Sequence, residues 1–448
     1  MKEIFKAYDI RGIYPEEINE KLVEATGRAF VTYMKAKTVA VASDKRSSSP
    51  SLLAALKKGI TEAGADVIEL GLLSTPMLYF AASRLAIDGA IMVTASHNPG
   101  EYNGLKLCKK NAVPIGLASG LAEIRDIALA NNFINGEKFG VISEHDIKPE
   151  YDKYISSFAK LGGKKFHLAT DTAHAMGVLE LPIYNMLPGV TLCGRLYDTL
   201  QLPGVCPHEA NPLKTDTLVE LQHIVHKTKA DMGIAYDGDA DRIGFVDDKG
   251  RIVPMDLVTA LLAESLAQEF PKKIALFDLR SSRAVKEVIE EHGWEAHESK
   301  VGHANIKKQM IEEGAILAGE VSGHYYFALS NYIAEMGTLP AILLLNLMSR
   351  TGKKLSELVD NVKRYSHSGE INMEIADAKD IITRIRATHA DGAISDLDGV
   401  KVVYPSWWFS LRASNTEPLL RLNLEADTLE MMEEKREELL RAIGGKPE

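Results

Sequence analysis

Short runs of apolar residues, each opened by a basic residue and closed by an aspartate, occur at three widely spaced places in the chain. Their length and their small or β-branched residues are typical of buried strands. Polar residues and a helical pattern, such as the one at 284–292, follow each run. The three runs occupy residues 37–44, 165–171 and 273–278.

Two further apolar runs complete each unit, and small residues open the last of them. The second runs lie at 64–71, 189–196 and 293–302, and the third runs at 89–93, 233–236 and 314–318. The order strand, helix, strand, helix, strand is typical of a largely parallel sheet with right-handed crossovers. We therefore predict three related α/β domains, although unrelated α/β domains share the same pattern.

The last part of the chain follows a different pattern, which predicts a small α+β domain with an antiparallel sheet. Asp398-Gly399 fits a hairpin turn in it, and residues 366–369 are predicted to form a linker before it. Strands are expected at 371–375, 400–404, 407–411 and 419–424, and helices at 378–389 and 429–443.

A chain of 448 residues is too long for one core, and its length indicates three or four domains. The three units and the tail together predict four. The fold class is α/β, with three related domains of mixed, largely parallel sheets and a C-terminal α+β domain. The predicted domains are 1–150, 151–250, 251–365 and 366–448.

The composition narrows the functional classes. A net charge of −10 argues against non-specific binding to nucleic acids or anionic membranes. Three cysteines at spacings unlike those of metal ligands indicate a reducing compartment. The N-terminal residues lack a signal-peptide core, and the most apolar run, 341–348, is too short to span a bilayer. We expect a cytoplasmic protein.

Polar loops follow the third strand of each unit. They are Thr94–Pro99, Asp237–Arg242 and Gly319–His324. Since α/β sheets bind ligands at the carboxyl ends of their strands, three equivalent loops are expected to meet in one cleft. Ser96 is placed as a nucleophile or phosphate acceptor, although such a cluster taken alone is usually a turn.

The second loop carries aspartates at alternating positions: Asp237, Asp239 and Asp241. Their mutual repulsion favours a bound cation, and an all-oxygen ligand set suits Mg²⁺. An exposed acidic turn and a phosphatase with an aspartate nucleophile are the alternatives.

The tail contains a group of phosphate-donor residues, for which a simple polar hairpin loop is the alternative. Arginine forks match phosphate oxygens, and hydroxyls and turn amides complete such a nest. The group comprises Arg412, Ser414, Asn415, Thr416 and Arg421. In the third unit, Glu320 and Ser322 are candidates for binding sugar hydroxyls, and His303 is a candidate for titration near neutrality.

Five motifs in chain order give the sequence a close resemblance to the α-D-phosphohexomutase superfamily, within it to the bacterial phosphomannomutase/phosphoglucomutase group. The resemblance covers essentially the whole chain. Its motifs are Tyr8–Gly12, Thr94–Pro99 with Tyr102–Lys106, Asp237–Arg242, Gly319–His324 and Arg412–Pro418.

The resemblance implies four domains around a central cleft and a phosphoserine at Ser96. It implies Mg²⁺ held by the three aspartates and a phosphoserine oxygen. The phosphoryl group would pass to a hexose monophosphate, giving a hexose 1,6-bisphosphate that reorients and returns its other phosphate. This bisphosphate would also serve as activator. The implied partners are small hexose phosphates, with no nucleic acid or membrane, and the sequence predicts no oligomeric state.

The resemblance also assigns roles to single residues. His303 would be a general acid or base, and Arg11 and Lys106 would give electrostatic support. Arg242 and Arg280 would position the substrate or the Ser96 loop. Tyr8 and His97 would contribute to substrate binding.

Three departures from the family pattern stand out. Arg280 replaces a common lysine. The loop Gly319–His324, which we call the sugar loop, has Val321 and Gly323 where methionine and alanine are frequent. Relatives acting on glucosamine phosphate usually have glutamine at position 321, so Val321 favours mannose or glucose phosphates. The segment 171–177 lacks the usual Gly-Asn-Gly, which we interpret as a structural difference away from the chemistry. A phosphoglucosamine mutase, a non-catalytic sugar-phosphate-binding protein and a serine-dependent phosphatase remain alternatives.

Overall fold

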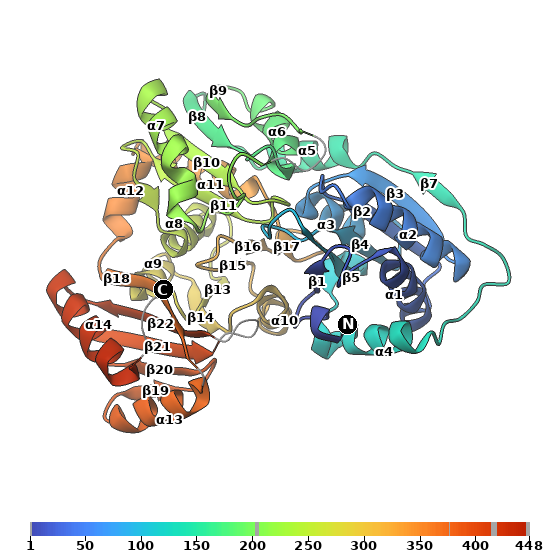
Figure 1. Cartoon of the computed structure of the whole chain (residues 1–448). Coiled ribbons are helices and arrows are strands. Elements are labelled where there is room, and N and C mark those ends of the chain that lie inside the picture. Colours follow the sequence, from blue (N-terminus) through green and yellow to red (C-terminus); the bar gives the residue numbers. More distant parts are fainter. Residues whose placement is uncertain (1, 202–205, 376, 414–418, 445–448) are drawn as a thin grey trace.

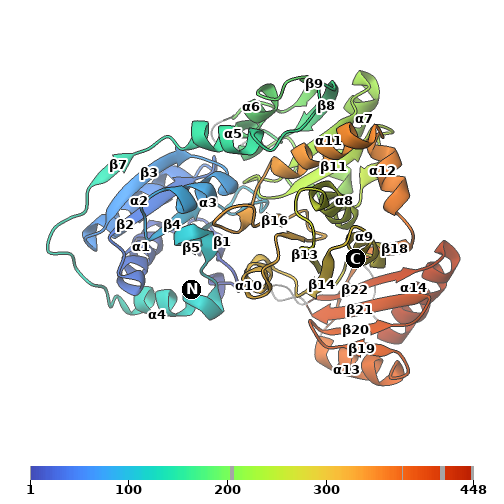
Figure 2. The same cartoon turned by 180° about the vertical axis from the view of Figure 1, so that it is seen from behind.

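The computed structural model describes residues 2–201, 206–375, 377–413 and 419–444, which form four sheets in successive lobes along the chain (Figure 1). The lobes follow the colour order from blue through green and yellow to red, and the view from behind shows the same succession (Figure 2).

The first lobe has a seven-stranded sheet in the order β1-β5-β4-β2-β3-β7, with β6 paired to β5. Its strands are β1 (Ile10–Ile13), β2 (Thr38–Ser43), β3 (Asp66–Leu72), β4 (Gly89–Val93), β5 (Tyr102–Lys109), β6 (Val113–Pro114) and β7 (Ile142–Glu144). Its helices are α1 (Glu20–Met34), α2 (Ser49–Glu62), α3 (Thr75–Arg84) and α4 (Leu121–Ala130), with 3-10 turns at Lys2–Ile4, Lys110–Ala112 and Leu117–Ser119. Helix α5 (Lys148–Ser156) leads into the second lobe.

The second lobe has a five-stranded sheet in the order β12-β11-β10-β8-β9. Its strands are β8 (Phe166–Asp171), β9 (Val190–Leu196), β10 (Met232–Tyr236), β11 (Ile243–Asp247) and β12 (Ile252–Val253). Its helices are α6 (Leu181–Asn185) and α7 (Val219–Thr228), with 3-10 turns at Met176–Leu179 and Thr215–Leu218.

The third lobe has a five-stranded sheet in the order β14-β13-β15-β16-β17. Its strands are β13 (Ile274–Asp278), β14 (Glu295–Ser299), β15 (Leu317–Gly319), β16 (Tyr325–Phe327) and β17 (Ala334–Glu335). Its helices are α8 (Met255–Ala267), α9 (Arg283–Glu291), α10 (His303–Glu313), α11 (Leu339–Thr351) and α12 (Leu355–Val362).

The predicted repeat is confirmed by strand order. In each of these three sheets the first strand of the unit lies between the second and the third, and all three run parallel. The next strand then returns antiparallel to the third. The three polar loops therefore occupy equivalent positions, each between a third strand and its antiparallel neighbour.

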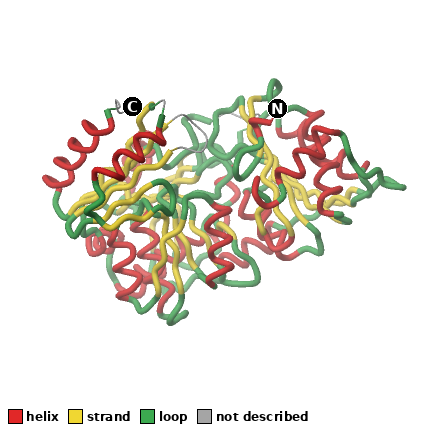
Figure 3. The backbone as a smooth tube through the Cα atoms, turned by 90° about the horizontal axis from the view of Figure 1, so that it is seen from below, coloured by secondary structure: helices red, strands yellow, loops and turns green. Residues whose placement is uncertain are grey.

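The tail forms an antiparallel five-stranded sheet in the order β18-β22-β21-β20-β19. Helices α13 and α14 contact each other and this sheet, and Figure 3 shows helices and strands as separate layers. The elements are β18 (Ser366–Glu374), α13 (Ala378–Thr388), β19 (Ala393–Ser395), β20 (Val400–Val403), β21 (Trp407–Ala413), β22 (Leu419–Ala426) and α14 (Leu429–Ile443).

One prediction for the tail was wrong. Residues 366–369 do not form a linker, because they are the first part of β18 and pair with β22 across a register shift. Their polar composition hid a strand whose backbone pairing holds it in the sheet. Strand β19, which pairs with β20 across the predicted Asp398-Gly399 turn, was not predicted.

The first three lobes share a large apolar core, whereas the tail has its own. One large cluster of buried residues runs through the first three lobes, from Ala40 to Val362. The tail has a separate core, formed between its sheet and its helices. Charged contacts join it to the third lobe instead, among them Arg283 with Glu425 and Asp427.

A buried glutamate lies where the first three lobes meet. Glu180 accepts hydrogen bonds from Ser74 of the first lobe (2.7 Å) and Thr338 of the third (2.8 Å). Tyr151 donates a longer bond. Burial raises the pKa of Glu180 to about 7, because its partners are hydroxyls without a positive charge. None of the described helices has both the length and the apolar composition needed to cross a bilayer.

Candidate active site

Ser96 lies at the meeting point of two of the predicted loops. It is buried, and its Oγ donates a hydrogen bond to Asp237 Oδ2 at 2.8 Å. Its backbone adopts the left-handed conformation (φ 54°), an uncommon one for serine, and its N–H is held by Thr94 Oγ1. A Cβ on Gly238 would lie 2.1 Å from the Ser96 carbonyl oxygen, so only glycine permits this approach of the two loops.

Arg46 holds the Ser96 loop in place, a role that sequence reasoning missed. Its guanidinium donates to the carbonyl oxygens of Ser96 and Asn98 at 2.8 and 2.5 Å. It also donates to the carbonyls of Pro99 and Tyr102, and it pairs with Asp44. The only sequence signal was its position just after the strand β2.

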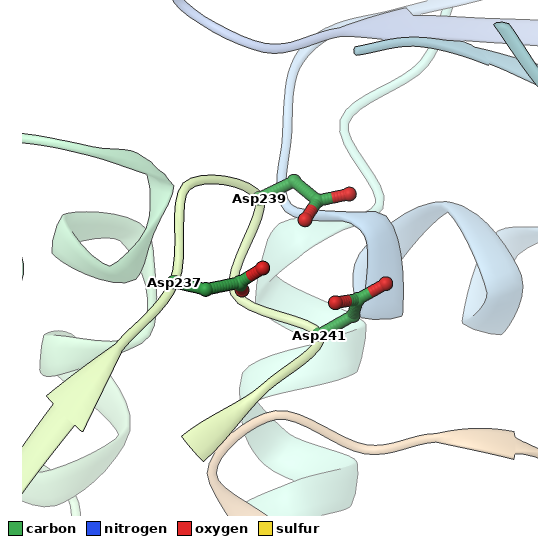
Figure 4. A group of neighbouring side chains, drawn as sticks. All are labelled: Asp237, Asp239 and Asp241. Carbon is green, nitrogen blue, oxygen red and sulfur yellow. The ribbon is translucent and has the colours of Figure 1, made fainter. Parts of the chain in front are cut away.

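The three aspartates point toward one another from the loop between β10 and β11 (Figure 4). One oxygen of each lies within 4.8 Å of the others, and all three side chains are buried. Lys106 Nζ contacts Asp239 at 2.6 Å and Asp241 at 2.5 Å. Asp239 Oδ1 is buried and has no hydrogen-bond partner among the described residues.

This concentration of negative charge requires cations. Burial, together with the neighbouring charges of Asp241 and Asp239, raises the pKa of Asp237 to about 8. Burial acts on Asp241 as well, but Lys106 and His324 hold the pKa of Asp241 well below its usual range. The buried oxygens and the free position at Asp239 Oδ1 fit a hard divalent cation.

The third loop joins the same site through His324, a residue that sequence reasoning did not single out. His324 Nε2 lies 3.2 Å from Asp241 Oδ1, and its Nδ1 lies 3.2 Å from Glu320 Oε2 and 2.8 Å from Ser322 Oγ. Burial opposes its protonation, but Asp241 and Glu320 raise the pKa of His324 to about 9. Its spacing of four residues from Glu320 was the available signal.

Glu320 is tightly held. Its carboxylate accepts hydrogen bonds from the Gly302 N–H (2.9 Å) and from Tyr326 OH (2.6 Å). Although burial acts in the opposite direction, the contact with His324 lowers the pKa of Glu320. The side chain is therefore an ionised acceptor of fixed orientation.

His303 begins helix α10 and packs edge-on against Tyr8, with 5.2 Å between ring centroids. Tyr8 donates to the Val301 carbonyl and so links the first and third lobes. Burial and the positive charges of Lys307 and Lys106 hold the pKa of His303 well below its usual range. The ring is thus held in its neutral form, with a buried Nδ1 that has no hydrogen-bond partner among the described residues.

Further cations surround Ser96. Arg11 donates to Asn98 Oδ1 at 2.7 Å and pairs with Asp9 at 2.8 Å. Arg242 Nε lies 3.9 Å from Asp237 Oδ2. His97 Nδ1 lies 3.2 Å from Ser96 Oγ, and burial next to Arg242 and Arg11 lowers the pKa of His97 well below its usual range.

Three arginines form a second charged cluster around Glu370. Arg280 Nη1, Arg421 Nη1 and Arg412 Nη2 lie 3.2, 3.3 and 3.5 Å from its carboxylate oxygens. Asp278 connects this cluster with the sugar loop, since it accepts from Arg280 (2.7 Å) and from the Val321 N–H (2.9 Å). The predicted residues Ser414, Asn415 and Thr416 lie outside the described residues.

The segment 171–177 is nearer to this chemistry than the sequence suggested. Ala175 lines, with Ser96, His97 and Gly238, a cavity of about 680 Å³ beside the Ser96 loop. The Met176 N–H donates to the Gly238 carbonyl at 3.2 Å. Our interpretation of this segment as distant was therefore wrong, because the fold brings the end of β8 next to the end of β10.

The site combines a serine hydrogen-bonded to an aspartate, a loop with an ionised glutamate, and a cluster of guanidinium groups. This combination is typical of an α/β enzyme that transfers phosphoryl groups. Family models of phosphoglucomutase/phosphomannomutase match in chain order. Alpha/beta/alpha domains I, II and III match residues 2–135, 149–250 and 254–365, and the C-terminal domain matches 370–442. The chain belongs to the phosphoglucomutase/phosphomannomutase family, and it is a hexose-phosphate mutase of the isomerase class.

Relatives match over nearly their whole length. The chain is 37% identical to a phosphomannomutase of Methanocaldococcus jannaschii, over 98% of this chain and 97% of that protein. It is 35% identical to a phosphomannomutase of Vibrio cholerae, over 99% of each. A crystal structure of a phosphoglucomutase/phosphomannomutase family protein from Burkholderia thailandensis superposes with a TM-score of 0.90 at 28% identity, covering 100% of this chain and 99% of that one.

Proposed function

We propose that the enzyme interconverts the 6-phosphates and 1-phosphates of mannose and glucose through a phosphoserine at Ser96 and a hexose 1,6-bisphosphate intermediate. The observation that carries this proposal is the position of Ser96 Oγ, 2.8 Å from Asp237 in a buried triad of carboxylates. The phosphomannomutase relatives support mannose phosphate as a substrate. We keep 1–150, 151–250, 251–365 and 366–448 as the proposed domain limits, and the cytoplasm as the proposed compartment.

Mg²⁺ is the proposed metal, with Asp237, Asp239 and Asp241 and an oxygen of phosphorylated Ser96 as ligands. Bound there, the ion offsets negative charge on the transferring phosphoryl group. The fit rests on the buried oxygens of the triad and on Asp239 Oδ1, which lacks a partner among the described residues.

The first transfer places a free hydroxyl of the hexose monophosphate against phosphorylated Ser96. The phosphorus–oxygen bond to Ser96 breaks while a bond to the sugar oxygen forms, and the proton of that hydroxyl leaves. His303 is the proposed acceptor of this proton, because its Nδ1 is neutral and has no partner among the described residues. Lys106 and Arg11 offset the developing charge.

The sugar and its remote phosphate are held by different groups. Glu320 and Ser322 present oxygens to sugar hydroxyls, and Arg280, Arg412 and Arg421 hold the phosphate that does not react. After the bisphosphate turns over, its other phosphate returns to Ser96 and the isomeric monophosphate leaves. A catalytic amount of hexose 1,6-bisphosphate would recharge enzyme that has lost its phosphoryl group.

A coupled assay tests this function directly. Mannose 1-phosphate and glucose 1-phosphate, with Mg²⁺ and bisphosphate, should be converted to their 6-phosphates, and intact mass should show one phosphate on Ser96. No turnover of either sugar phosphate would sink the proposal. Preference for glucosamine phosphate would redirect the assignment, and net release of phosphate would indicate a phosphatase.

A further inference from the structure

Glu370 stands out because it contacts all three arginines of the basic cluster. It lies on β18, while its partners come from other segments: Arg280 follows β13, Arg412 lies on β21 and Arg421 on β22. Two guanidiniums approach Oε2 and one approaches Oε1, all at 3.2–3.5 Å. The arginines are thus drawn together across the junction of the third lobe with the tail.

The contact with Glu370 leaves Arg412 incompletely paired. Each guanidinium has five N–H donors, whereas a carboxylate offers about four acceptor positions. Arg412 is only 5% exposed, and its Nε has no hydrogen-bond partner among the described residues. A buried cation with an unused donor indicates that the cluster is built for a further anion.

The charges support the same interpretation. Arg280 pairs with Asp278 as well as with Glu370, whereas Arg412 contacts the carboxylate of Glu370, at 3.5 Å, among the described residues. Asp278 stays attached to Arg280 and to the sugar loop, so Glu370 is the carboxylate whose place a phosphate would take. Burial and the nearby Arg280 lower the pKa of Arg412, as expected for like charges held close together.

We propose that Glu370 is a positioning residue that holds the three guanidiniums between binding events and competes with the substrate's remote phosphate for them. This inference rests on the proposed function, in which the bisphosphate releases that phosphate and presents the other in its place. A competing carboxylate keeps the arginines aligned during the exchange and prevents the phosphate from binding too tightly to leave.

The test is Glu370→Gln, which keeps an oxygen acceptor and removes the charge. For this variant we expect a Kd for inorganic phosphate roughly three- to tenfold lower than for the wild type, measured by calorimetry. KM for the hexose phosphate should fall with it, and kcat should fall because release of the remote phosphate slows. Glu370→Asp keeps the charge on a shorter side chain and should lie between the two.

Glu374→Gln, at the exposed end of the same strand, is the matched control and should leave these constants unchanged. A purely structural role for Glu370 predicts the opposite result, weaker phosphate binding and a raised KM in Glu370→Gln, and would overturn the inference. So would unchanged binding, or no binding of phosphate by either protein up to tens of millimolar. Lack of mutase activity in the wild type would refute the proposed function instead, and the phosphate titration would still decide the role of Glu370.

Discussion

The two charged clusters of this enzyme are near mirror images. In one, the ammonium group of Lys106 contacts two of the three carboxylates, those of Asp239 and Asp241, and in the other, the carboxylate of Glu370 contacts three guanidiniums. Each single ion stands where a ligand of its own sign is expected, a cation in the first and a phosphate in the second. Each cluster thus holds a side chain with the sign of charge of its proposed ligand.

They differ in how they are built. The carboxylates come from one six-residue loop, next to a core that runs through three lobes. The guanidiniums come from separate segments on two sides of a charged junction, and the Glu370 side chain between them keeps 22% of its exposure. A small ion needs fixed ligands, whereas a phosphate that enters and leaves in each cycle needs adjustable ones.

Replacing Ser96 with alanine should have the largest effect. It removes the proposed phosphoryl carrier from the acidic cluster, so kcat/KM should fall by about 10³-fold or more. The coupled assay measures the loss of turnover, and intact mass measures the loss of the bound phosphate. Ser51→Ala, on the exposed face of α2, is the control. Near-wild-type turnover in Ser96→Ala would refute the assigned role.

Asp239→Asn breaks the acidic cluster itself. It removes a charge that Lys106 and the proposed Mg²⁺ share, so activity should fall by about 10²-fold and partly recover at high Mg²⁺. Titration of activity with Mg²⁺ shows the shift. Asp216→Asn, at an exposed position, should behave as the wild type, and an unchanged Mg²⁺ dependence in Asp239→Asn would contradict the metal assignment.

Arg412→Lys breaks the basic cluster. An ammonium group keeps the charge but cannot make forked contacts with phosphate. KM for the hexose phosphate should rise by about tenfold, with a smaller change in kcat. Steady-state kinetics of Arg412→Lys beside the exposed Arg386→Lys test this. A loss confined to kcat would argue against a role in phosphate binding.

Glu180 sharpens the comparison, because it is a buried carboxylate whose hydrogen-bond partners among the described residues are hydroxyl groups. Its pKa is raised to about 7 from an ordinary 4.5. Its contribution to stability is therefore full below pH 4.5 and is lost as the pH rises through 7, at a cost of up to about 3 kcal/mol. In Glu180→Gln, the free energy of unfolding should differ less between pH 5 and pH 8 than it does in the wild type, as measured by urea denaturation. Glu137→Gln, on an exposed loop, should keep the wild-type slope, and an unchanged slope in Glu180→Gln would refute the assignment.

The smallest expected effect concerns the segment 171–177, which packs against the loop Asp237–Arg242. Ala173 has a left-handed backbone (φ 47°), which disfavours residues with a Cβ. Ala173→Gly should therefore raise the free energy of unfolding by about 0.5–1 kcal/mol. Ala263→Gly, inside helix α8, should lower it. Destabilisation of Ala173→Gly would show that the strain is compensated elsewhere.

The sequence predicted features formed by neighbouring residues, but not those that depend on contacts between distant segments. The strands β4 and β10 and the loops after them were visible, because buried strands and their polar exits lie side by side in the chain. The aspartates were visible for the same reason. Arg46, His324 and Glu370 were not, since their importance comes from contacts with distant segments. Residues 366–369 were mistaken for a linker because backbone pairing with β22, which composition does not show, holds them in the sheet.

The separate core of the tail has a consequence for how the enzyme comes into being. A chain emerging from the ribosome completes domains from its N-terminus onward. Here the serine and the aspartates belong to lobes that share a core and are synthesised first, while Arg412 and Arg421 arrive last. In the proposed mechanism, a chain without the tail could carry the phosphoryl group on Ser96 but would lack Arg412 and Arg421 to bind the remote phosphate of the sugar. On that mechanism, the enzyme gains the capacity for isomerisation only when the final lobe is complete.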